Sequence, residues 1–320
     1  MKTIAVIGAS GMQGGAVVKA FHELKSSGNA EFIIRGLSRD PSSEKAEAIK
    51  PFTDEFMKAD ADDVESMVKA FDGCYGAFVV TDFYQRFSAK HEMETTRNIK
   101  EAAKKAGLKH VVLSTLEDTR IIINNADNKD TWKVIDDELG MYVPHFDGKG
   151  EAADDFASEV PTTKLWTCMY MESFIHFGMG PSRQKDDDPF AITFPMGNSK
   201  LALVSLSDIG KMVCACFQDP ATIGTTQGAM SDALTCKDIA DLFAKYCNFP
   251  DVTYNDVPTE VYASFGFPGA AELANMFRYY KEFEDQFISS REANETALEK
   301  MGGTEKFSDW LQKNKDAFSA

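Results

Sequence analysis

The feature that most constrains the fold is a short apolar segment at the start of the chain that runs into a glycine-rich turn. Residues 3–7 (TIAVI) predict a strand, and Gly8-Ala9-Ser10-Gly11-Met12-Gln13-Gly14-Gly15 leads from it into residues with helical spacing of apolar side chains. Glycines lack Cβ atoms, so the turn can bend sharply and bring its amides close to a phosphate. The helix N-terminus beyond it offers unpaired N–H groups and a positive dipole end. This pattern predicts a dinucleotide-binding unit; a glycine-rich turn that binds nothing is the simpler alternative.

The composition indicates a folded, acidic protein. Of 320 residues 43% are hydrophobic, and 34 Lys and Arg against 50 Asp and Glu give a formal net charge of −16. This charge disfavours direct binding of nucleic acid. Residues 3–8 are too short for a signal sequence and no segment is long enough to span a membrane, so we expect a soluble cytoplasmic protein, with the nucleus as a second compartment.

The cysteines and histidines do not show the spacing of a metal site, and we assign no metal. We expect the cysteines to be reduced and mostly buried, with a thiol switch as the alternative. The six are Cys74, Cys168, Cys214, Cys216, Cys236 and Cys247.

The first half of the chain alternates predicted strands and helices. We expect strands at 32–37, 55–59, 77–80, 110–114 and 163–168, with helices at 62–71 and 89–106 between them. The sequence therefore predicts an α/β fold, a Rossmann doubly wound parallel sheet. The polar stretch 118–144 is longer than a usual connection and is expected to be a surface excursion.

The pattern changes after residue 168. Short strands (190–194, 201–204, 225–230) mix with helices (209–217, 237–246, 270–287). We expect a Rossmann domain at 1–168 and a smaller C-terminal α/β lobe at 169–320, some of whose elements can return to the main sheet. Ligands bind outside the carboxyl ends of the strands, so this lobe would close the cleft over the cofactor.

The end of the second predicted strand indicates which dinucleotide is bound. Leu37-Ser38-Arg39 stands where NAD-binding domains place an acid. A guanidinium beside a hydroxyl suits a 2′-phosphate, so we expect NADP. Two alternatives stay open, an Arg39 paired with Asp40 and a solvated surface arginine. Asp60 and Ala61, after the third strand, would lie beside the adenine, and Asp60 could equally cap a helix.

Four motifs extend over essentially the whole chain and identify a resemblance. They are Gly8 to Gly15, Ser38-Arg39-Asp40-Pro41, His145-Phe146-Asp147-Gly148-Lys149-Gly150-Glu151, and Gly266-Phe267-Pro268-Gly269-Ala270 continuing to Leu273-Ala274-Asn275-Met276-Phe277-Arg278-Tyr279-Tyr280. With them the chain resembles the NmrA-like family, an atypical branch of the short-chain dehydrogenase/reductases, and in particular its NADPH redox-sensor branch. Catalytic members of the wider superfamily use a Tyr-x-x-x-Lys pair. None of the nine tyrosines here has lysine four residues on, and His145 precedes Lys149 at the matching place.

The resemblance implies further cofactor contacts at residues 81–84 after the fourth predicted strand, at residues 170–173 after the sixth, and at Lys149. Asp82 and Ser173 stand where the family usually has Asn, and Ser43 where it often has a second basic residue. The predicted cofactor-binding residues are Gly8, Ala9, Ser10, Gly11, Met12, Gln13, Ser38, Arg39, Ser43, Asp60, Ala61, Thr81, Asp82, Phe83, Tyr84, Lys149, Tyr170, Met171, Glu172 and Ser173. His145 and Lys149 are the candidates for a catalytic role.

The resemblance implies an NADP(H)-binding regulator that reports NADPH availability to protein partners and can form a homodimer. The alternative is an NADPH-dependent reductase of quinones or conjugated carbonyls, with His145, Tyr142 or a water held by Lys149 as proton source. A structural protein with a vestigial pocket is the third hypothesis.

Overall fold

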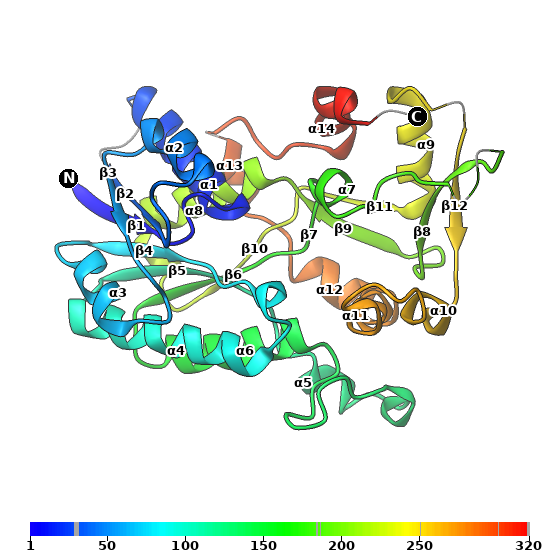
Figure 1. Cartoon of the computed structure of the whole chain (residues 1–320), viewed down its shortest axis with the longest axis horizontal. Coiled ribbons are helices and arrows are strands. Elements are labelled where there is room, and N and C mark those ends of the chain that lie inside the picture. Colours follow the sequence, from blue (N-terminus) through cyan, green and yellow to red (C-terminus); the bar gives the residue numbers. More distant parts are fainter. Residues whose placement is uncertain (29–31, 184, 186, 250, 300, 319–320) are drawn as a thin grey trace.

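A seven-stranded parallel sheet forms the centre of the computed structural model (Figure 1), which describes residues 1–28, 32–183, 185, 187–249, 251–299 and 301–318. The strand order is β10-β6-β5-β4-β1-β2-β3, and every neighbouring pair is parallel. The winding reverses between β1 and β4, which opens a crevice at the carboxyl edge where β1 ends. The strands are β1 (Lys2–Val6), β2 (Phe32–Ser38), β3 (Glu55–Lys58), β4 (Gly76–Val79), β5 (His110–Thr115), β6 (Thr162–Trp166) and β10 (Thr226–Gly228).

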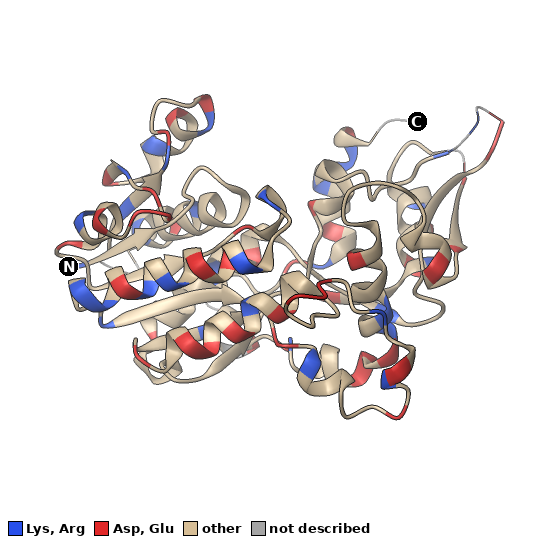
Figure 2. Cartoon of the chain, turned by 60° about the horizontal axis from the view of Figure 1, so that its bottom comes forward, with Lys and Arg blue, Asp and Glu red and all other residues tan. Residues whose placement is uncertain are grey.

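Helices cover both faces of this sheet because successive residues of its strands point to opposite sides. In β1, Ile4 and Val6 belong to the core beneath α1 (Met12–Ser26) and α8 (Leu206–Gln218), whereas Ala5 belongs to the core beneath the other layer. That layer holds α3 (Val64–Phe71), α4 (Ala89–Ala106) and α6 (Pro144–Ala157) (Figure 1). Acidic and basic residues are interleaved along these helices (Figure 2), as solvated outer faces require. The expected doubly wound Rossmann fold is confirmed.

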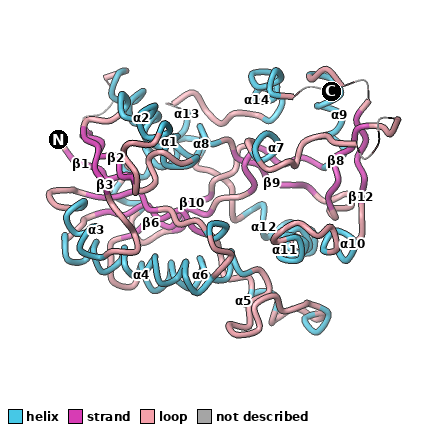
Figure 3. Tube along the Cα trace, in the orientation of Figure 1, coloured by secondary structure: helices cyan, strands magenta, loops and turns pink. Residues whose placement is uncertain are grey.

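A smaller lobe of mixed strands and helices lies beside the sheet (Figure 3). It contains a three-stranded sheet, β11-β9-β7, and a parallel pair, β12-β8. Its elements are β7 (Met169–Tyr170), α7 (Ser173–His176), β8 (Phe190–Phe194), β9 (Lys200–Val204), β11 (Asp232–Thr235), α9 (Cys236–Tyr246), β12 (Val252–Asp256), α10 (Thr259–Ala263), α11 (Ala270–Glu282), α12 (Glu284–Ser289) and α14 (Phe307–Asn314). The short α13 (Glu295–Glu299) packs instead on α8 beside the main sheet.

Three boundaries differ from the sequence prediction. The helix expected at 270–287 is two helices, because Phe283 between them leaves helical geometry (φ −119°, ψ 34°). The strand expected at 163–168 stops at Trp166, and β7 begins a different sheet at Met169. The strand expected at 225–230 is the shorter β10, which pairs with β6 and so returns to the main sheet.

The excursion at 118–144 holds short helical segments, α5 (Arg120–Ile123) and η3 (Lys129–Thr131), and is anchored to α6. The buried Asp147 carboxylate accepts hydrogen bonds from the backbone and hydroxyl of Thr119 and from the N–H groups of Tyr142 and Val143. Burial raises the pKa of this carboxyl to about 6. Asp147 therefore ties both ends of the excursion to the start of α6.

The six cysteines are free and buried, as expected. Burial raises the pKa of the thiols, for Cys216 to about 12, which disfavours the reactive thiolate and with it a thiol switch. Within the described part of the chain, no helix is both long and apolar enough to cross a membrane.

Candidate functional site

The glycine-rich turn lies in the crevice between β2 and β4. Ala9 N–H donates to the Leu37 carbonyl of β2 and Ile7 N–H to the Phe78 carbonyl of β4. Gly8 has a positive φ of 63°, and a Cβ on Gly14 would lie 2.2 Å from the Gly8 carbonyl oxygen. Only glycine at position 14 allows this close approach of helix and turn.

The start of α1 has free backbone donors. Its N-cap is Gly11, which has no side chain to accept a hydrogen bond. The backbone N–H groups of Met12 and Gln13 donate to no acceptor among the described residues. Unpaired donors and the positive helix end together make an anion-binding site.

Ser38 and Arg39, at the end of β2, lie next to this turn. The hydroxyls of Ser10 and Ser38 are 3.4 Å apart. Arg39 is exposed and, in the described ranges, forms no hydrogen bond or ion pair. Asp40 instead accepts from the hydroxyl (2.6 Å) and N–H (2.9 Å) of Ser42, which lower its pKa. Arg39 is therefore free to bind an anion, and the pairing with Asp40 is not formed.

Sequence reasoning missed Lys58. In the parallel pairing of β2 and β3 its Cα lies opposite that of Ser38, and its charge contributes to the lowered pKa of Asp40. Lys58 is exposed and forms no ion pair within the described chain. Lys58 is the last residue of a predicted strand, which was a usable signal. Its relevance follows only once β3 is known to lie beside β2.

Ser43, Asp60 and Ala61 lie at the same edge of the sheet. The Ser43 hydroxyl caps α2 (Glu44–Ile49), accepting from Ala46 N–H and donating to the Asp40 carbonyl. Asp60 accepts from Asp62 N–H at 3.1 Å in the turn after β3. The cap of α3 is Asp63, so the alternative in which Asp60 caps this helix is wrong.

Lys149 and Thr81, both predicted cofactor-binding residues, contact each other and a third residue. The Lys149 ammonium donates to the carbonyl and hydroxyl of Thr81, both at 3.0 Å, and to the carboxylate of Glu92 on α4. Glu92 is 1% exposed in its side chain, and its Oε2 atom has no hydrogen-bond partner among the residues that the structure describes. This buried ion pair lies at the carboxyl end of β4, and sequence reasoning did not single out Glu92.

Tyr170 is the member of the 170–173 group that reaches the turn. Its hydroxyl accepts a 2.6 Å hydrogen bond from the Gln13 amide, whose Oε1 atom is buried and has no partner in the described part of the chain. Burial raises the pKa of Tyr170 to about 12. Met171 is buried in the core, as is Ser173, and the Glu172 carboxylate accepts from Leu206 N–H and the Trp310 indole.

His145 packs among aromatic rings beside this site. Its Nδ1 atom bonds to Glu272 of α11, and its ring centroid is 5.4 Å from that of Tyr84. Tyr84 belongs to η2 (Phe83–Gln85), which Asp82 caps by accepting Tyr84 N–H. Glu272 is 4% exposed. No motif connects Glu272 with His145, which lies 127 residues away along the chain.

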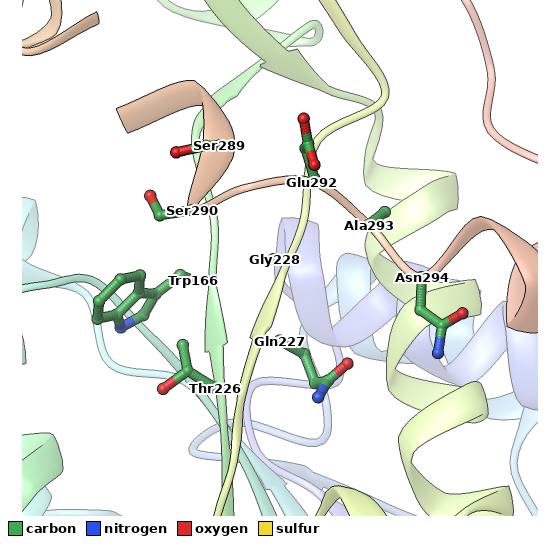
Figure 4. Close-up of a pocket in the computed structure, with 9 residues that line it drawn as sticks. All are labelled: Trp166, Thr226, Gln227, Gly228, Ser289, Ser290, Glu292, Ala293 and Asn294. Atoms are coloured by element: carbon green, nitrogen blue, oxygen red, sulfur yellow. The ribbon is translucent and has the colours of Figure 1, made fainter. Parts of the chain in front are cut away.

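A separate depression of about 510 Å³ lies at the carboxyl ends of β6 and β10 (Figure 4). Trp166, Gln227, Ser290 and Asn294 are among its lining residues. None of the predicted cofactor-binding residues lines it.

Comparison with protein families identifies the relatives of this chain. The model of the NmrA-like family matches residues 1–311. The chain belongs to the NmrA-like family. Among NmrA-like relatives, the oxidoreductase malD of Malbranchea aurantiaca is 29% identical over 238 residues, 71% of this chain and 68% of malD. An NmrA-like family domain-containing protein of Dictyostelium discoideum is 25% identical over 88% of each chain. The match to the oxidoreductase FrzB of Cladobotryum sp, 34% identical, spans 35% of this chain and only 33% of FrzB.

Solved structures of NmrA-like proteins share the fold. NmrA, described as a negative transcriptional regulator, in complex with NADP has a TM-score of 0.75 at 17% identity, covering 98% of this chain and 95% of NmrA. NmrA has also been solved with NAD. Triphenylmethane reductase of Citrobacter sp., complexed with NADP(H), has a TM-score of 0.70 at 17% identity and covers 97% of this chain and 99% of its own.

Proposed function

We propose that this NmrA-like protein binds NADP(H) and acts as a regulator that reports NADPH availability to protein partners. The observation that best supports NADP(H) binding is a pair of exposed cations, Arg39 and Lys58, beside Ser38 and the glycine-rich turn. Neither forms an ion pair within the described residues. The free N–H groups at the start of α1 suit the pyrophosphate. The buried, unpartnered Gln13 Oε1 marks a polar atom that a ligand can satisfy.

The cations favour NADP over NAD. A 2′-phosphate is dianionic, and charge-assisted hydrogen bonds are worth about 1.5–3 kcal/mol each. One such bond corresponds to a preference of roughly ten- to hundredfold. Asp40 forms no ion pair with either cation within the described residues, because its carboxylate is turned to the hydroxyl and N–H of Ser42.

The regulator role is supported by the absence of the superfamily's catalytic tyrosine and by NmrA itself, whose description is that of a transcriptional regulator. Lys149 is already engaged with Thr81 and Glu92, so cofactor binding must rearrange or add to this buried pair. A cofactor shifts a conformational equilibrium only by its differential affinity for the two states. In this proposal the protein works in the cytoplasm, alone or as a homodimer.

Binding isotherms test the cofactor. We expect wild type to bind NADPH roughly ten- to hundredfold more tightly than NADH, and Arg39→Gln and Lys58→Gln each to lose about tenfold toward NADPH alone. Lys109→Gln, which removes an exposed charge at the opposite edge of the sheet, is the matched control. Equal affinities for the two nucleotides would contradict the assignment. Hydrogen exchange with and without saturating NADPH tests the regulator role. If the backbone amides outside the contact residues are equally protected in both states, the regulator role is refuted.

A second candidate function, NADPH-dependent reduction of a quinone or conjugated carbonyl, is favoured by one observation. His145 stands four residues before Lys149, and its ring is held by a carboxylate. Bound NADPH would supply the hydride, and a histidine can supply the proton that the superfamily's tyrosine otherwise gives.

A further inference from the structure

We infer that Glu272 positions His145 to give a proton to a planar conjugated carbonyl compound bound between the 83–87 and 265–269 segments. The inference rests on the second candidate function and adds to it a positioning residue and a binding surface.

Glu272 holds the imidazole from one side. His145 Nδ1 bonds to one carboxylate oxygen, and the Tyr84 hydroxyl donates to the other at 3.5 Å. Both side chains of the His145–Glu272 pair are at most 8% exposed. With Nδ1 committed to Glu272, the ring orientation and tautomer are fixed, and proton exchange with the cleft falls to Nε2.

The Nε2 atom is available for this exchange. Within the ranges that the structure describes it has no hydrogen-bond partner, yet it is not among the enclosed polar atoms that lack one. An imidazole that was only a packing element would have this nitrogen sealed or bonded to the protein.

Exposed aromatic side chains border the pair. Tyr84, Phe87, Phe265 and Phe267 are 41%, 48%, 46% and 38% exposed, unusual values for large rings that share one region. The ring centroids of Tyr84 and Phe87 are 5.7 Å apart. The ring of Tyr262 lies between those of Phe265 and Phe267, with centroid distances of 5.2 and 5.8 Å. Aromatic faces favour planar, conjugated ligands.

The two segments are in contact, so they form one surface. Phe87 has a positive φ of 50°, a conformation that costs free energy for a bulky residue. A Cβ on Gly269, the N-cap of α11, would lie 3.1 Å from the Phe87 ring. The strained loop therefore packs against the start of the helix that carries Glu272.

The step balances with NADPH as reductant. A hydride adds to the electrophilic carbon of the conjugated system, and the π electrons displaced from it collect on the carbonyl oxygen. The imidazolium form of His145, whose charge Glu272 balances, carries a second proton on Nε2; this proton moves to that oxygen, the acceptor is reduced by two electrons, and solvent returns a proton to Nε2. Glu272 keeps Nδ1–H throughout.

Nitrogen-15 NMR of histidine-labelled full-length protein, without cofactor, tests the positioning. At a pH where the rings are neutral, we expect His145, assigned by the loss of its signals in His145→Gln, to carry its proton on Nδ1. Glu272→Gln should mix the tautomers, and Glu272→Asp should retain the wild-type one. A mixed or Nε2–H tautomer in wild type would overturn the proposal.

Turnover of 2-methyl-1,4-naphthoquinone with NADPH tests the proton transfer. We expect His145→Gln and Glu272→Gln to lower kcat at least tenfold with unchanged NADPH affinity, and Glu260→Gln on α10 to match wild type. Failure of NADPH to bind would remove the proposed function and leave the NMR result intact. Binding with no turnover would refute the second candidate function together with the inference, and turnover indifferent to His145 would refute the inference alone.

Discussion

Gln13, the second residue of α1, donates a 2.6 Å hydrogen bond to the hydroxyl of Tyr170 in β7. The glycine-rich turn is thereby joined to the first strand of the smaller lobe. The same amide has a buried Oε1 atom with no hydrogen-bond partner among the described residues, so under the proposed function this contact would link cofactor binding to the lobe.

Tyr170→Phe removes this link without changing the ring. We expect a loss of about 1 kcal/mol in the free energy of unfolding, measured with urea, because a buried donor loses its acceptor. NADPH affinity should fall severalfold. Tyr246→Phe, whose hydroxyl has no hydrogen bond in the part of the chain described, should change neither quantity.

Two neighbouring glycines of α1 should respond oppositely to the same substitution. In Gly14→Ala the new Cβ would meet the Gly8 carbonyl oxygen at 2.2 Å, so we expect a loss of about 1–3 kcal/mol and of NADPH binding. In Gly15→Ala the nearest atom is 3.4 Å away, and the higher helix propensity of alanine offsets this contact. Thermal melts with and without NADPH measure both, and a destabilised Gly15→Ala with a normal Gly14→Ala would contradict the geometry.

The buried pair of Lys149 and Glu92 should behave as a unit. Glu92→Gln leaves the ammonium without its counter-charge, and breaking a buried pair costs about 3–5 kcal/mol. Lys149→Met should cost a similar amount, whereas the double variant should recover much of the loss. Urea unfolding of the four proteins measures the coupling free energy, and additive losses would show that the pair is not coupled.

His110 should make the protein sensitive to moderate acid. Burial lowers its pKa from 6.5 to about 4, and its side chain is held by Thr163. The unfolded chain takes up the proton first, so stability that is present above pH 6.5 is lost as the pH falls toward 4. At about 1.4 kcal/mol for each pKa unit, the loss is roughly 3 kcal/mol. His110→Gln keeps a hydrogen-bonding side chain and should flatten the dependence of the free energy of unfolding on pH in this window. An unchanged slope would assign the acid sensitivity to other groups.

The sequence predicted the sheet well because the signals are local. The helix at 89–106 matches α4 at both ends, since Ser88 caps it and Gly107 ends it in the left-handed conformation.

The parts that escaped prediction depend on pairings between distant segments. Lys58 becomes relevant only once β3 is known to flank β2, and Glu92 and Glu272 only once α4 and α11 are placed against α6. The break between α11 and α12 at Phe283 could not be predicted, because no glycine or proline stands there.

The return of β10 to the main sheet has a consequence for how such a chain can be divided. Between β6 and β10 the backbone leaves for the lobe, contributes α8 to the layer on α1, and comes back to complete the sheet. Gly210 of α8 lies so close to α1 that a Cβ would be 2.6 Å from the Ala16 carbonyl oxygen. Cutting at residue 168 would strip β6 of its outer neighbour and uncover an apolar helix face. The segment up to residue 168 is thus not a self-contained unit, and we expect the two parts of the chain to fold together.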